Sequence, residues 1–66
     1  MPTTYEIHYM TNEGTPEQAA LVGSEVSARQ YAIALSRLSK HSVTITRVLE
    51  DGSKQVTERY RDGYPY

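Results

Sequence analysis

Cysteine, tryptophan and phenylalanine are absent from this 66-residue sequence. Without cysteine, the chain has no disulfide, no thiolate zinc site and no cysteine nucleophile, and this composition is typical of proteins in the reducing cytosol. The sequence also lacks both a run of about 18 apolar residues and a basic segment followed by an apolar stretch at its start. We therefore expect a cytoplasmic protein with no membrane span and no secretory signal.

The length predicts one domain, residues 1–66. A chain of about 60 residues buries only about 60% of its unfolded surface and has no room for a second core, which excludes a two-domain enzyme. The formal net charge is only −1, and six tyrosines supply apolar bulk. A small folded domain is therefore expected rather than a disordered tail.

Charge is distributed unevenly along the chain. Residues 1–26 carry four glutamates and no base, whereas residues 27–66 carry all seven Lys and Arg residues and four acids. These counts give −4 for the first segment and +3 for the second. Such segregation can orient a partner, although it is also compatible with ordinary solvated surface.

Alternating side chains predict a strand over residues 3–11, followed by turn-forming residues at 12–16. Residues 18–24 fit either a helix or a second strand, and the short length, the glycine and the preceding turn favour the strand. Residues 43–49 and 54–61 are rich in β-branched or alternating residues and predict a hairpin. A two-residue turn at Asp51–Gly52 would pair Val43 with Tyr60, Ile45 with Glu58, and Arg47 with Val56.

A helix is predicted to begin at Ser27, because Gln30 stands three residues later as in a capping box. Val26 and Tyr31 would form the accompanying hydrophobic staple. The helix should end near residues 40–41, where cations favour the negative end of its dipole. Its apolar stripe would consist of Ala28, Tyr31, Ala32, Leu35 and Leu38.

These elements predict an α+β fold in β-β-α-β-β order. A small antiparallel sheet of three to four strands would be covered on one face by one helix, with the other face open to solvent or to a partner. Residues 62–66 would form an irregular C-terminal tail. The core would be filled by the tyrosines of the regular elements: Tyr5, Tyr9, Tyr31 and Tyr60.

Residues that could perform catalysis do not converge in this sequence. His8 lies on a predicted strand and His41 at a helix end, and neither belongs to a zinc-binding pair. The serines lie outside the Gly-x-Ser-x-Gly pattern, and the four glycines are scattered among turns rather than gathered in a phosphate-binding loop. We therefore predict no catalytic residue, no metal site and no cofactor, and hence no enzyme.

Three groups of residues are candidates for binding a partner. The exposed side of the helix would carry a basic stripe around one isoleucine, suited to phosphates or an acidic protein groove unless it is only solvated surface. The acidic residues of the first part would suit a basic groove meant for DNA, and the two tail tyrosines would either fold back or enter a partner's pocket. The three groups are Arg29, Ile33, Arg37 and Lys40; Glu6, Glu13 and Glu17; and Tyr64 and Tyr66.

In size and layout over residues 3–61, the chain resembles small proteins encoded by phages and mobile elements. The segments "SARQYAIALSRL" and "VTITRVLEDGSKQVTERY" contribute the helix and the hairpin of this layout. Among such proteins it most resembles the anti-CRISPR proteins. The resemblance implies a non-enzymatic inhibitor that binds a subunit of a bacterial CRISPR effector and blocks target DNA binding or assembly.

Two other functions remain open from the residues alone. One is a nucleic-acid-binding domain using the basic second part, with phosphates on the helix bases or on Arg59 and Arg61. The isoelectric point of 6.0 argues against nucleic acid as the partner. The other is a homodimeric interaction module whose sheet edge or open face meets a second copy. The resulting order is a protein-binding inhibitor first, then a nucleic-acid binder, with an enzyme last.

Overall fold

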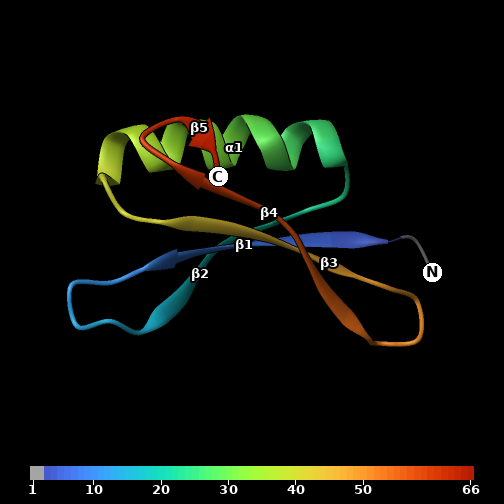
Figure 1. Cartoon of the computed structure of the whole chain (residues 1–66). Coiled ribbons are helices and arrows are strands. Elements are labelled where there is room, and N and C mark those ends of the chain that lie inside the picture. The colour runs from blue at the N-terminus through green and yellow to red at the C-terminus, as the bar shows by residue number, and fades with distance from the viewer. Residues whose placement is uncertain (1–2) are drawn as a thin grey trace.

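One antiparallel sheet is covered on a single face by one helix (Figure 1). The computed structural model describes residues 3–66, so the first two residues of the predicted domain lie outside the described residues. Its elements are β1 (Thr4–Met10), β2 (Pro16–Val22), α1 (Glu25–Ser39), β3 (Val43–Val48), β4 (Lys54–Arg61) and β5 (Tyr64–Pro65). The strand order is β2-β1-β3-β4-β5. The α+β class is confirmed, with five strands where three to four were predicted.

The β1–β2 and β3–β4 hairpins close at opposite ends of the sheet (Figure 1). Their turns share one hydrogen-bond pattern and a glycine with positive φ, Gly14 in the first and Gly52 in the second. In the β3–β4 turn the Gly52 amide donates to the Leu49 carbonyl at 3.0 Å, and the Leu49 amide donates to Ser53 at 2.8 Å. Gly52 has a φ of 89°, which suits a type I turn followed by a left-handed glycine. The two-residue turn predicted at Asp51–Gly52 is therefore wrong, because Glu50 also belongs to the turn.

The predicted register of this hairpin holds at its open end. Val43 pairs with Tyr60 and Ile45 with Glu58, as expected. The next pair is Thr46 with Val56, so Thr57 is an extra residue in β4 and forms a bulge. Arg47 consequently pairs with Gln55 rather than with Val56, and Val56 moves to the opposite face of the sheet.

The C-terminal residues 62–66 are ordered, which corrects the predicted irregular tail. Asp62 and Gly63 both have positive φ, 56° and 88°, the requirement of a two-residue type I′ turn. This turn reverses the chain so that Tyr64 pairs with Arg61 and Pro65 with Tyr60. Of the two Asp-Gly pairs in the sequence, the one at residues 62–63 therefore forms a two-residue turn.

Helix α1 begins earlier than predicted. Ser24, not Ser27, is the N-cap, and its Oγ accepts a hydrogen bond from the Ser27 amide at 3.1 Å. Glu25 then lies in the first turn, where its carboxylate is favoured by the positive end of the helix dipole. The predicted end is confirmed, because Lys40 adopts the left-handed C-cap conformation with a φ of 62°.

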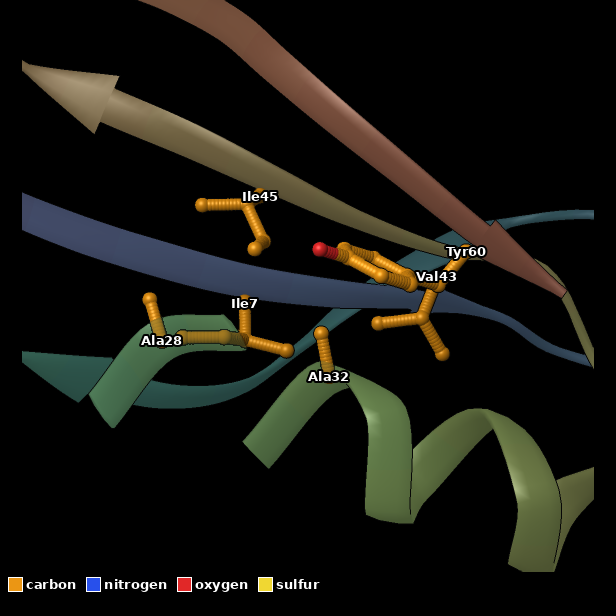
Figure 2. Packing of buried hydrophobic residues seen from close by; sticks show 6 residues of the cluster. All are labelled: Ile7, Ala28, Ala32, Val43, Ile45 and Tyr60. Atoms are coloured by element: carbon orange, nitrogen blue, oxygen red, sulfur yellow. The ribbon is translucent and has the colours of Figure 1, made fainter. Parts of the chain in front are cut away.

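The core lies between α1 and the central strands (Figure 2). Ala28 and Ala32, with Ser36 one turn further, form the buried stripe of the helix, and small side chains let it approach the sheet closely. Leu38 was expected in this stripe but is 83% exposed, because the stripe is centred on a different side of the helix. Among residues 3–66, six apolar residues are buried: Ile7, Ala28, Ala32, Val43, Ile45 and Tyr60.

Candidate functional site: the open face of the sheet

The basic stripe predicted on the exposed side of α1 contacts the protein itself. Arg29 forms ion pairs with Glu25 and Glu58, at 2.6 and 2.8 Å. Lys40 lies 3.4 Å from the carboxylate of Asp62, and the side chain of Arg37 lies against Gly63. Ile33 was predicted as an exposed anchor, but it is partly buried and packs against the core. This side of the helix therefore attaches α1 to the C-terminal part of the sheet.

The ion pair of Arg29 continues into a short network. The Tyr60 hydroxyl donates to Glu58 Oε2 at 2.7 Å. Burial raises the pKa of Tyr60, and the bond to Glu58 raises it further. Burial also raises the pKa of Glu58, but hydrogen bonds from Tyr60 and Arg29 outweigh that effect, so this pKa lies below its usual range. The Glu58 carboxylate is therefore held ionised as the link between α1 and β4.

The three acidic candidates do not gather on one surface. Glu6 lies 3.2 Å from the ammonium of Lys54, and its side chain is only 14% exposed. Glu17 accepts a hydrogen bond from the Tyr9 hydroxyl at 3.2 Å, which raises the pKa of Tyr9. Glu13 occupies the exposed turn between β1 and β2. The fold therefore separates these glutamates, and the first one is neutralised by a lysine.

A different surface emerges on the side of the sheet away from α1. In β1, Glu6 and His8 flank the buried Ile7 and so point away from the helix. Cross-strand partners share a face, which places Leu21 of β2 beside Glu6. The same pairing extends the surface across β3, β4 and β5. We define the open face as Glu6, His8, Met10, Leu21, Thr44, Thr46, Lys54, Val56, Arg59, Arg61, Tyr64 and Tyr66.

Apolar side chains are concentrated on this open face. Leu21 and Val56 are 58% and 52% exposed, and Tyr64 is 69% exposed. Met10 and Tyr66 add to the same face, so it carries five of the eight large hydrophobic residues that are exposed among residues 3–66. Most of the exposed large apolar side chains of residues 3–66 therefore lie on one side of one sheet.

The C-terminal end of the open face combines aromatic and cationic side chains, and we call Arg59, Arg61, Tyr64 and Tyr66 the C-terminal corner. The Arg61 guanidinium lies over the Tyr66 ring, 4.9 Å from its centroid. The Tyr66 amide donates to the Arg59 carbonyl at 3.0 Å, and the Tyr66 hydroxyl is hydrogen-bonded to Ser42. Within residues 3–66, neither Arg59 nor Arg61 is paired with a carboxylate.

No pocket opens anywhere in residues 3–66, and over the same range no three potential metal ligands lie together. The helix of this described part is too short and too polar to cross a membrane. No family model matches the chain, and neither a curated protein nor a solved structure matches it. The arguments for function therefore rest on the exposed surfaces.

Sequence reasoning placed Tyr64 and Tyr66 among the candidates but missed the residues around them. Leu21, Val56 and Met10 were not singled out, and Arg59 and Arg61 were considered only as phosphate contacts. A type I′ turn at residues 62–63 would have revealed that both tyrosines share a face with these arginines. The Asp-Gly pair was the signal available for that turn.

Proposed function

We propose that this protein is a non-enzymatic, cytoplasmic binding protein that inhibits a protein partner by covering one of its surfaces. The open face is the contact surface in this proposal. The observation that carries it is the gathering of Leu21, Val56 and three further exposed apolar side chains on that face. Exposed large apolar side chains that gather among polar residues on one face are typical of protein-contact surfaces on small domains.

For a partner of the kind bound by anti-CRISPR proteins, the geometry favours one mode of inhibition. A mimic of DNA needs a row of exposed carboxylates, whereas Glu6 is paired with Lys54 and Glu17 with Tyr9. The open face instead offers apolar and basic groups, which suit a contact between protein subunits. We therefore favour occupation of a protein surface of a CRISPR effector subunit over occupation of its DNA channel.

A nucleic-acid-binding function is the second candidate, supported by the C-terminal corner. Tyrosines and arginines on an open sheet are used by proteins that bind single strands, where bases stack on the aromatic rings. Against this candidate, Leu21 and Val56 offer nothing to a phosphate backbone. The helix bases Arg29 and Lys40 are also engaged by carboxylates within the protein.

The test replaces open-face residues and compares them with matched residues elsewhere. The double variant Leu21→Lys/Val56→Lys places two charges in the proposed contact. Its control, Val26→Lys/Leu38→Lys, makes the same chemical change at exposed positions of α1. The measurement is co-elution with each of a set of purified CRISPR effectors, together with target DNA binding by the effector.

We expect the wild type and the α1 control to bind and inhibit at least one effector, and the open-face variant to lose both activities. Circular dichroism establishes that both variants remain folded. Equal inhibition by the two variants would refute the open face as the contact. Failure of the wild type to bind any effector would refute the anti-CRISPR assignment.

A further inference from the structure

We propose that the C-terminal corner is the anchor of this contact and that it recognises an acidic protein surface, an inference that rests on the proposed function. The corner would place Arg59 and Arg61 against carboxylates of the partner. Tyr64 and Tyr66 would pack on the apolar surface beside those carboxylates. The proposal thus defines the sign of the partner's charge and the part of the open face that meets it.

The first argument is the charge balance of the molecule. On the open face, three bases stand against Glu6 alone, and Lys54 neutralises that glutamate. Two positive charges remain at the corner, while the rest of the chain carries a net charge of −3, because the total is −1. A basic corner on an otherwise acidic protein is complementary to an acidic partner and orients its approach.

The second argument concerns the two arginines of the corner. Arg29, Lys40 and Lys54 each have a carboxylate within 4 Å inside the protein. Arg59 and Arg61 have none among residues 3–66, although both are exposed. Planar guanidinium groups form bidentate hydrogen bonds with carboxylates, so these two side chains are available for that geometry in a partner.

The third argument is that the corner is held in place before a partner binds. Pairing with β4 fixes β5, and the Gly63 amide donates to the buried Ser36 hydroxyl at 2.8 Å. The hydroxyl of Tyr66 is bonded to the side chain of Ser42, which directly precedes β3. Aromatic and arginine side chains that are ordered in advance lose less entropy on binding, and they are the residues enriched at interface hot spots.

Aliphatic neighbours favour a protein over a nucleic acid as the occupant. Met10 lies beside Ser42, because its amide donates to the Ser42 carbonyl at 3.0 Å. The register of β3 with β4 continues this row to Arg61. Leu21 and Val56 lie further along the strands from the corner, at the two ends of the row in which Glu6 pairs with Thr46. A protein surface with carboxylates beside apolar residues satisfies both kinds of group at once.

The test titrates isotope-labelled protein with poly-L-glutamate and, separately, with a 15-nucleotide oligothymidine, and follows the amide resonances. The corner variant is Arg59→Gln/Arg61→Gln. Its control, Gln30→Glu/Ala34→Glu on the exposed side of α1, changes the net charge by the same amount. Poly-L-lysine serves as the polymer of opposite sign.

We expect poly-L-glutamate to shift the amides of residues 59–66 most. The affinity should fall about tenfold or more in the corner variant, should change little in the control, and should decrease with added salt. Equal losses in both variants, or shifts spread evenly over the other bases, would overturn the proposal. Saturable binding of oligothymidine at the corner, tighter than that of poly-L-glutamate, would show that the partner is a nucleic acid rather than an acidic protein.

This titration can fail independently of the proposed function. If Leu21→Lys/Val56→Lys abolishes effector binding while Arg59→Gln/Arg61→Gln preserves it, the open face remains the contact and the acidic anchor is wrong. If the corner responds to poly-L-glutamate but no open-face variant alters inhibition, the proposed function is wrong and the charge preference stands.

Discussion

Replacing Ser36 with alanine tests how the C-terminal residues are attached to the helix. Ser36 is fully buried, and its Oγ donates to the Ile33 carbonyl at 3.0 Å while accepting from the Gly63 amide at 2.8 Å. Alanine fits the same space but removes the acceptor. The Gly63 amide would then be buried without a partner.

The magnitude follows from two opposing effects. A buried donor left without an acceptor costs about 1 to 3 kcal/mol. Alanine is the better helix former, which offsets the loss by roughly 0.5 kcal/mol. The net destabilisation of Ser36→Ala is therefore about 0.5 to 2.5 kcal/mol. In a domain of this size, each kcal/mol lowers Tm by about 4 to 8 °C.

The assay combines urea unfolding with hydrogen exchange of the Gly63 amide. The control is Ser27→Ala, because Ser27 is an exposed serine of the same helix and gains the same helix propensity. We expect Ser36→Ala to lower the unfolding midpoint and accelerate exchange at Gly63, and Ser27→Ala to do neither. Equal midpoints and equal Gly63 exchange in the two variants would refute the reasoning.

Three further predictions concern the cap, the C-terminal turn and the ion pair. Ser24→Ala should cost about 0.5 to 2 kcal/mol by urea unfolding, and no loss would contradict its assignment as N-cap. Gly63→Ala should cost about 1 to 2 kcal/mol because the φ of 88° is unfavourable for a residue with a side chain. The new Cβ would also overlap the Arg37 side chain, and adding Arg37→Ala should relieve only that overlap. Because the folded pKa of Glu58 is lowered, its stabilisation is complete above the unfolded pKa and is lost as pH falls through the folded value. Stability measured from pH 7 to 3 should therefore fall less steeply in Glu58→Gln, and identical profiles would show that the pair contributes nothing.

Alternation along the chain was sufficient to predict the long strands, because a half-buried strand imposes a period of two on its side chains. Ile7 between polar neighbours in β1 is an example. The helix start was predicted three residues too late, because Ser24 and Ser27 both resemble N-caps. Which of the two serines acts as the cap depends on where the folded chain begins the first turn. The C-terminal residues were harder, since a two-residue strand has too few residues to show a period.

The candidate site was only partly predictable for a related reason. A bulge at Thr57 reverses the faces of the residues that precede it in β4, so Val56 changes from the covered face to the open face. A second irregularity, in the pairing of β1 with β2, leaves Ala19 without a cross-strand partner. The shift in register that it causes pairs Leu21 with Glu6 of the open face. Neither bulge has a signature in the sequence, and without them the apolar part of the open face cannot be assembled.

The interior place of β1 in the sheet, between β2 and β3, has a consequence for how the chain folds. β1 precedes the other strands of this sheet in the chain, yet it pairs with β3, and residues such as Thr4 and Val48 are partners across 44 positions of sequence. The two hairpins are local and form quickly, whereas joining them must wait until a long loop containing the helix has closed. On the ribosome, the β1–β2 hairpin therefore presents an unpaired strand edge until residues 43–48 have emerged. In a fragment truncated before β3 that edge would stay unpaired and favour aggregation. In the full chain, the rate at which the two hairpins dock determines how long the edge is exposed.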